Sequence, residues 1–264
     1  MEHGNLSLAL FTVLMQSSVG LVIMHLVAKF AGWQTDPVIS KGYRVPLLAL
    51  AAGISGVAVS FSHLGYPLHA VNALNNLGSS WMSLEILLSI VFIVFVSGWF
   101  SMQYFGLSKL MVNISVAGAV ISGSGLIYAM IRVYTLPAMV YLDVQSVSVS
   151  YVSTSLFAGS LLLWLVTDHR ERHLLVRIFL LSVIFLSASF LNNLVTITSL
   201  PSINRLTLIT LTIYLLSLIA AFSIIIINPE NKKNWLSVIF IVFALTAELA
   251  GRAHLLNYTI SGLW

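Results

Sequence analysis

Long apolar segments separated by short polar stretches run through the whole chain. Each apolar segment is close to the ~20 residues that a helix needs to cross the hydrocarbon core of a bilayer. None of them alternates apolar and polar residues as a membrane-facing strand does, so helices are predicted. Eight segments qualify, at residues 7–31, 43–63, 84–105, 109–131, 147–167, 174–196, 206–227 and 235–256.

We therefore predict an all-α integral membrane protein, a single domain over residues 1–264 built as a bundle of eight transmembrane helices. The connections leave no room for a soluble domain. The fifth segment is rich in Ser and Thr (VSVSYVSTSLFAG), but these side chains can hydrogen-bond back to their own helix or across to a neighbour, so a helix is still expected. No basic residue precedes the first apolar run, which indicates a first helix that is not cleaved.

Composition supports a membrane protein and excludes other classes. Charged residues make up 8% of the 264 residues and hydrophobic residues 59%, whereas soluble domains carry about 25% charged residues. A soluble enzyme is thereby excluded, and no basic patch with interleaved aromatic residues indicates nucleic-acid binding. The sequence has no cysteine, so we expect neither an iron–sulfur cluster nor a c-type haem within it.

The basic residues predict the orientation, because Lys and Arg concentrate on the cytoplasmic side of membrane proteins. Three of the 12, Arg132, Arg205 and Arg252, fall on the side that also carries both termini. The opposite side, formed by the odd-numbered loops and their flanks, holds nine: Lys29, Lys41, Arg44, Lys109, Arg170, Arg172, Arg177, Lys232 and Lys233. We predict that the odd-numbered loops are cytoplasmic and that both termini lie outside.

Ionisable residues inside a membrane cost several kcal/mol and therefore mark candidate functional positions. Glu248 lies 13 residues beyond Trp235, which is roughly 20 Å along a helix, and Arg252 follows it on the same face. Five such residues, from four segments, are expected at a common outer depth: His63, Glu85, Arg132, Glu248 and Arg252. The loop between His63 and Glu85 is expected to contain a short amphipathic helix, over 68–77, in the outer interface.

Each member also has a purely structural interpretation. Glu248 and Arg252 can neutralise one another as an i,i+4 pair, and Glu85 and Arg132 are favourable at helix ends because of the helix dipole. His63 can cap its helix. A b-type haem between His63 and His254 is conceivable, but we expect none. The convergence of all five residues favours a functional site.

Histidine and glutamate in a partly apolar pocket can accept protons from a weakly acidic hydroxyl group, and arginine can fix polar oxygens. A quinol presents two such hydroxyl groups on an apolar ring that arrives from the bilayer. Its oxidation also releases two electrons, which no residue of this protein can accept. A cofactor-bearing partner is therefore required.

The stretch HLGYPLHAVNALNNLGSSWMSLEI, from His63 to Ile86, resembles the membrane anchor subunit of bacterial dimethyl sulfoxide reductases, the DmsC family. Two shorter stretches, IRVYTLPAM at 131–139 and AELAGRAHLL at 247–256, are similar to segments of the same family. The resemblance implies a bacterial inner-membrane protein that oxidises menaquinol on the periplasmic side. It also implies two partners, a ferredoxin-like iron–sulfur subunit and a molybdopterin catalytic subunit.

By this resemblance, His63 and Glu85 are the expected catalytic pair. The other expected quinol-binding residues are Arg132, Glu248, Arg252, Tyr66 and Pro67. His69 and Asn76 stand where relatives often carry basic residues, and the stretch between the sixth and seventh segments matches poorly. The terminal electron acceptor is therefore left open between a sulfoxide, an N-oxide, selenate and another oxyanion.

Two other functions fit part of the pattern. A secondary transporter can use Glu248 and Arg252 as a coupling pair, although the two halves of the chain show no internal repeat of the kind common in transporters. The second alternative function is a passive anchor whose quinol site has decayed. The intact His63 and Glu85 argue against it.

Overall fold

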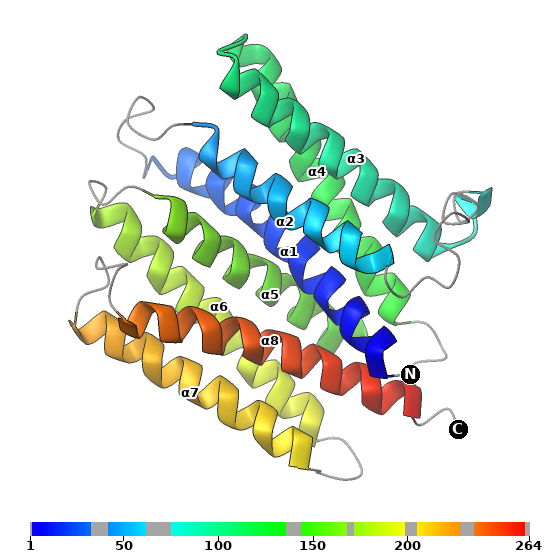
Figure 1. The fold of residues 1–264 in the computed structure, drawn as a ribbon, viewed down its shortest axis with the longest axis vertical. Coiled ribbons are helices and arrows are strands. Elements are labelled where there is room, and N and C mark those ends of the chain that lie inside the picture. The colour runs from blue at the N-terminus through cyan, green and yellow to red at the C-terminus, as the bar shows by residue number, and fades with distance from the viewer. Residues whose placement is uncertain are drawn as a thin grey trace.

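The computed structural model describes residues 2–32, 42–61, 75–135, 144–167, 172–198, 205–227 and 235–261, and these contain eight helices (Figure 1). The helices are α1 (Glu2–Phe30), α2 (Arg44–Phe61), α3 (Trp81–Tyr104), α4 (Lys109–Tyr134), α5 (Val144–Val166), α6 (Arg172–Thr198), α7 (Arg205–Ile227) and α8 (Trp235–Ser261).

Each of the eight predicted segments forms a helix, including the Ser- and Thr-rich fifth one. In α5, Ser148 Oγ donates to the carbonyl of Val144 (2.6 Å), whereas Ser155 Oγ donates across to the carbonyl of Gln16 in α1 (3.0 Å). Both ways of satisfying a hydroxyl inside a membrane are therefore used. The boundaries differ most at the start of α1, which begins at Glu2, and at the end of α8, which reaches Ser261. Helix α3 also begins earlier than predicted, at Trp81, because Ser80 caps it and accepts a hydrogen bond from the Ser83 amide (3.4 Å).

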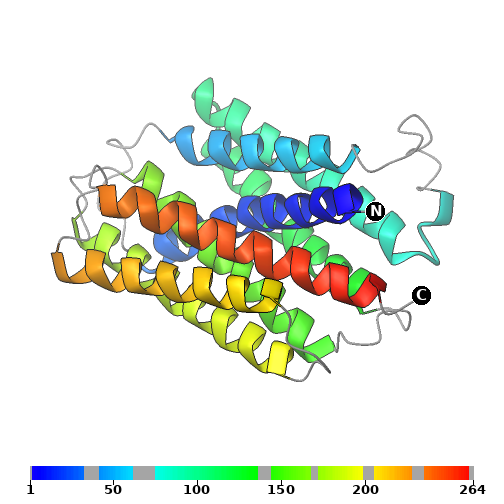
Figure 2. The ribbon, with the colours of Figure 1, turned by 60° about the horizontal axis from the view of Figure 1, so that its bottom comes forward.

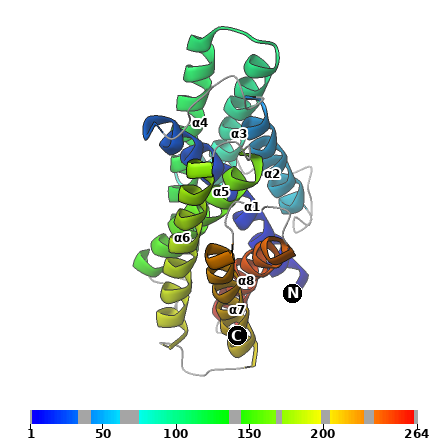
Figure 3. The ribbon, with the colours of Figure 1, turned by 90° about the vertical axis from the view of Figure 1, so that its left-hand side faces the viewer.

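Successive helices run in alternating directions, so the beginning of α1 and the end of α8 lie at the same end of the bundle (Figures 1 and 2). Viewed from the side, α1 and α5 occupy the middle, between α2, α3 and α4 on one side and α6, α7 and α8 on the other (Figure 3). The beginnings of α3, α5 and α7 and the ends of α2, α4 and α6 lie at the end of the bundle that carries the termini.

Six helices are long and apolar enough to cross a membrane, among the residues that the structure describes: Leu6–Phe30, Arg44–Phe61, Trp81–Tyr104, Lys109–Tyr134, Val144–Val166 and Val176–Thr196. Their outward faces carry large apolar side chains such as Val94, Ile121 and Val195, each more than 60% exposed. An apolar surface of this kind suits lipid rather than water. The structure is thus that of an α-helical membrane protein.

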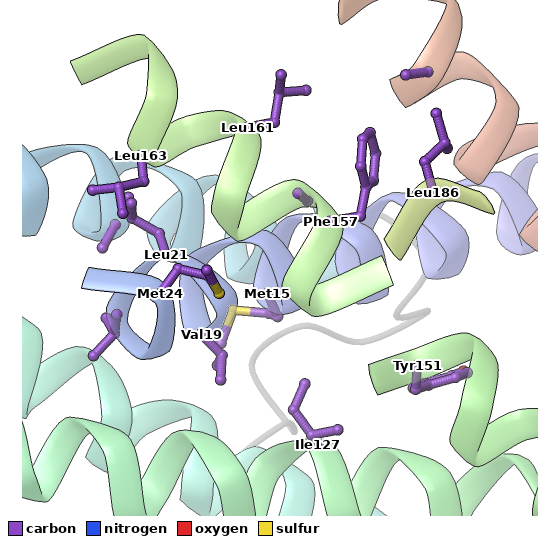
Figure 4. Close-up of a cluster of buried hydrophobic side chains, with 14 of the residues drawn as sticks. Met15, Val19, Leu21, Met24, Ile127, Tyr151, Phe157, Leu161, Leu163 and Leu186 are labelled. Carbon is purple, nitrogen blue, oxygen red and sulfur yellow. The ribbon is translucent and has the colours of Figure 1, made fainter. Parts of the chain in front are cut away.

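The tightest contact in the bundle is the crossing of α1 and α5 at two glycines. A Cβ atom at Gly20 would overlap the carbonyl oxygen of Ser155, and one at Gly159 would overlap the carbonyl group of Gly20. Only glycine lets two helix backbones approach so closely. Around the crossing, Met15, Val19, Leu21 and Met24 of α1 pack with Phe157, Leu161 and Leu163 of α5 in the core (Figure 4).

Replacing Gly20 with alanine should lower the free energy of unfolding by about 2 kcal/mol or more, because the added methyl group meets backbone atoms that have no free space to move into. The matched control is Gly98→Ala in α3, where the nearest atom to a new Cβ is Ser115 Oγ at 3.3 Å. Thermal unfolding in detergent, followed by tryptophan fluorescence, measures both. Equal melting temperatures for the two variants would contradict the close crossing.

Candidate functional site

Three of the predicted site residues are buried between the helices. Glu85 is 6% exposed, Glu248 2% and Arg252 5%. Glu85 is therefore enclosed by the helices, although it lies only one turn from the start of α3. Charged side chains that are this deeply enclosed need partners, and the contacts of each residue show what these partners are.

Glu248 and Arg252 are connected through Thr154 of α5. The Thr154 hydroxyl donates to Glu248 Oε2 (2.6 Å) and accepts from Arg252 Nη2 (3.3 Å). The two charged residues lie one turn apart on α8, as their spacing predicts. The i,i+4 pair is therefore part of a larger arrangement in which a neighbouring helix supplies the bridging group.

Helix α1 contributes Gln16, which is fully buried. Its side-chain oxygen, Oε1, accepts a hydrogen bond from Arg252 Nη2 (3.3 Å), and its main-chain carbonyl accepts the bond from Ser155 described above. Gln16 lies one turn before Gly20. The close α1–α5 crossing thus brings an amide side chain up to the guanidinium group.

Two tyrosines connect Arg252 with Glu85. The guanidinium carbon of Arg252 lies 3.9 Å from the centre of the Tyr151 ring, a cation–π arrangement. The Tyr151 ring in turn packs against that of Tyr134 in α4, with 5.5 Å between centroids. The carboxyl group of Glu85 is close enough to interact electrostatically with both tyrosines.

Helices α6 and α7 close the other side of Glu248. Ser189 and Tyr214 lie within interaction range of its carboxyl group, and Asn193 Nδ2 donates to the Tyr214 hydroxyl (2.9 Å). A Cβ atom at Gly251 would lie 3.2 Å from that hydroxyl, so the absence of a side chain there leaves room for Tyr214 beside α8. Glu248 thereby contacts polar groups of three helices.

Arg132 lies apart from this inner cluster, at the edge of the bundle. Its guanidinium carbon is 5.1 Å from the centre of the Trp81 ring, which also packs edge-on against Tyr128 (5.6 Å). Trp81 precedes Glu85 by one turn on the same face of α3. Arg132 therefore marks the outer rim of the region that contains Glu85.

The described site residues form a series along the bundle instead of one layer. Glu85 lies four residues from the beginning of α3 and Arg132 two from the end of α4, whereas Arg252 and Glu248 lie nine and 13 residues from the end of α8. At 1.5 Å per residue, Glu248 is about 20 Å from that end of its helix. The site therefore extends from the end of the bundle into its middle.

Several predictions fall outside the described residues: His63, Tyr66, Pro67 and most of the amphipathic helix expected over 68–77. The same holds for the side chain of His254. His25 packs against Trp99, with 5.2 Å between ring centroids, in the opposite half of the bundle. The part of the chain that the structure describes has no group of three His, Asp or Glu side chains suited to hold a metal.

Sequence reasoning missed the uncharged members of the cluster. Gln16 is a single amide within an apolar run, and Tyr134, Tyr151 and Tyr214 resemble ordinary packing residues. Thr154 lies in the Ser- and Thr-rich stretch, whose composition bears first of all on helix formation. An available signal was the rarity of Gln in the middle of a membrane segment, where an amide needs a partner.

A bundle of long apolar helices that encloses charged, amide and hydroxyl groups towards one end defines a multi-pass membrane protein with an intramembrane polar site. A family model described as DMSO reductase anchor subunit (DmsC) matches residues 1–260. The protein therefore belongs to the family of DMSO reductase anchor subunits.

A curated relative agrees with this assignment over part of the sequence. This relative, one of the chains of the anaerobic dimethyl sulfoxide reductase of Haemophilus influenzae, is 39% identical over 89 residues. The match covers 33% of the present protein and 31% of the relative. No solved structure matches the fold at a significant level.

The stability of the bundle should be more sensitive to the loss of either Glu248 or Arg252, which Thr154 bridges, than to the loss of both. Replacing Arg252 alone with methionine should lower the free energy of unfolding by about 3 kcal/mol or more, because Glu248 is left as an uncompensated buried acid. The double variant Glu248→Leu/Arg252→Met should lose less.

Reversible unfolding in mixed micelles measures these free energies of unfolding. Arg177 is exposed, so Arg177→Met is the control for the loss of an arginine. The single variant Glu248→Leu completes the comparison. If the losses of unfolding free energy in Arg252→Met and Glu248→Leu add up to the loss in the double variant, the two residues do not neutralise each other.

Proposed function

We propose that the protein is the membrane anchor of an anaerobic respiratory molybdoenzyme complex and that it oxidises menaquinol at the periplasmic end of the bundle. The observation that carries this proposal is the buried Glu85, whose Oε1 makes no hydrogen bond to any described residue. It lies beside Tyr134 and Tyr151, near the end of the bundle from which the loop containing His63 departs.

Quinol oxidation uses these groups as follows. The two hydroxyl groups of the quinol lose their protons, one to Glu85 and the other to His63. Tyr66 and Pro67, which follow His63 in the sequence, bind the quinol with it, and Arg132 and Trp81 lie at the rim of the region around Glu85. Glu248 and Arg252 form the inner wall. The two electrons leave the protein for an iron–sulfur group on a partner.

The partners follow from the family. A ferredoxin-like iron–sulfur subunit accepts the electrons, and a molybdopterin catalytic subunit delivers them to a sulfoxide, an N-oxide or another oxyanion. Membership of the anchor subunit family supports this assembly, as does the name of the Haemophilus influenzae relative. The anchor itself does not act on the terminal acceptor.

The topology we propose is a single domain of eight spans over residues 1–264, in the bacterial inner membrane with both termini in the periplasm. The alternating helix directions and the lengths of α7 and α8, 23 and 27 residues, support eight crossings. The distribution of Lys and Arg supports the orientation.

Because the sequence contains no cysteine, single cysteines test this orientation directly. Ser79→Cys, before α3, should react with a membrane-impermeant maleimide in intact spheroplasts, whereas Ser108→Cys, between α3 and α4, should react only after lysis. Both serines are exposed. The reverse pattern of labelling would mean that Glu85 lies at the cytoplasmic end.

Replacing either proton acceptor should abolish quinol-dependent reduction by the assembled complex. Glu85→Gln and His63→Ala remove the groups that take the protons, so we expect a loss of at least about 100-fold, the range typical of general bases. Activity driven by an artificial dye that feeds the catalytic partner directly should persist.

Glu171→Gln and His173→Ala, at the predicted cytoplasmic end, are the matched controls and should retain quinol oxidation. Full quinol-dependent activity in both Glu85→Gln and His63→Ala would refute the proposed function.

A further inference from the structure

On the inner side of Glu85, buried polar atoms collect without hydrogen-bond partners. Within the described residues, the buried side-chain atoms without a hydrogen-bond partner include Glu85 Oε1, Tyr151 Oη, Gln16 Nε2 and Arg252 Nη1. They come from α3, α5, α1 and α8. Burial of an unpaired polar atom is costly and uncommon in native proteins, so several of them around one place point to a ligand.

The contacts among these residues show that the atoms belong to one cluster. Arg252 bonds Gln16 through its other terminal nitrogen (3.3 Å) and lies over the Tyr151 ring (3.9 Å). The Tyr151 ring in turn packs against Tyr134 of α4 (5.5 Å), the helix that packs along α3 and therefore beside the helix of Glu85.

The chemistry of the unpaired atoms describes that group. Gln16 Nε2 and Arg252 Nη1 are donors only, Glu85 Oε1 accepts when ionised, and the Tyr151 hydroxyl can do either. A hydroxyl oxygen attached to an apolar ring fits this set, because it donates its own proton to the acid and accepts hydrogen bonds from the remaining groups. When the oxygen becomes a carbonyl, it keeps its acceptor role.

We propose that Tyr151 and Gln16 bind one ring oxygen of the quinol and that Arg252 stabilises the negative charge on that oxygen while Glu85 takes its proton. This inference rests on the proposed function and deepens it. It places two residues without charge, from α5 and α1, in direct contact with the substrate.

The groups already described account for the protons and electrons that the quinol loses. The O–H bond of one quinol hydroxyl breaks, its proton goes to Glu85, and the bonding electron pair stays on the oxygen beside Arg252. The second hydroxyl gives up its proton as in the proposed function, and two electrons pass to the iron–sulfur partner, which leaves the quinone. Thr154, which also bonds Glu248, holds Arg252 from the inner side.

The surroundings of Tyr151 explain why this tyrosine is suited to the role. Its ring is fixed between the guanidinium group of Arg252 and the ring of Tyr134 (5.5 Å), and its side chain is 3% exposed. A hydroxyl held in place before the substrate arrives loses little entropy on binding. Tyr214, by contrast, already accepts a hydrogen bond from Asn193.

Tyr151→Phe in the intact complex tests the proposal, since phenylalanine keeps the ring under Arg252 and removes only the hydroxyl. We expect the affinity for a fluorescent quinone-site inhibitor to fall about tenfold and the KM for quinol to rise by a similar factor. Dye-driven activity should not change. Tyr104→Phe, which removes a tyrosine hydroxyl at the opposite end of α3 from Glu85, should bind the inhibitor as the natural protein does.

Gln16→Met is the second variant and should weaken inhibitor binding in the same direction. If both variants assemble and both bind the inhibitor with unchanged affinity, the inference is wrong, while the effect of Glu85→Gln still decides the proposed function. If Tyr104→Phe weakens binding as much as Tyr151→Phe does, the loss is a general effect of removing a tyrosine hydroxyl and the inference is again overturned.

Discussion

A full positive charge inside a membrane needs compensation, and the enclosure of Arg252 is the constraint on which the rest of this bundle depends. No single neighbour satisfies its guanidinium group. Thr154 relays it to the carboxylate of Glu248, the Gln16 side chain accepts from it, and the Tyr151 ring covers its face. These partners come from three helices, so α1, α5 and α8 must meet at one place.

The glycines at the α1–α5 crossing make that meeting possible. With Gly20 against Gly159, the two backbones touch and Gln16 reaches the arginine. Lipid provides no hydrophobic driving force between helices, so close packing and interhelical hydrogen bonds determine which helices associate. The same contacts that hold the bundle together thus create the polar wall behind Glu85. The α3–α4 hairpin supplies the opposite side of the site, because Tyr134 contacts Tyr151 of the central pair of helices.

The sequence was sufficient to predict the helices, because a run of about 20 apolar residues has few other solutions in a bilayer. It also located Glu85, Arg132, Glu248 and Arg252, since charges are rare in such segments. It did not reveal their partners. Arg252 and Gln16 lie 236 residues apart, and Glu248 and Thr154 lie 94 apart. A local pattern carries no information about contacts of this range. The end of α8 was also predicted too early: this helix extends to Ser261, beyond the predicted 256, because hydropathy alone does not indicate where a helix ends once it has passed the apolar region.

Photo-crosslinking tests most directly whether a quinol binds between Glu85 and Tyr151. A photoactivatable menaquinone analogue, irradiated in the intact complex and followed by peptide mass spectrometry, should label α3 near Glu85 and α5 near Tyr151, and excess menaquinol should suppress the labelling. Labelling confined to the opposite half, around His25 and Trp99, would contradict the account.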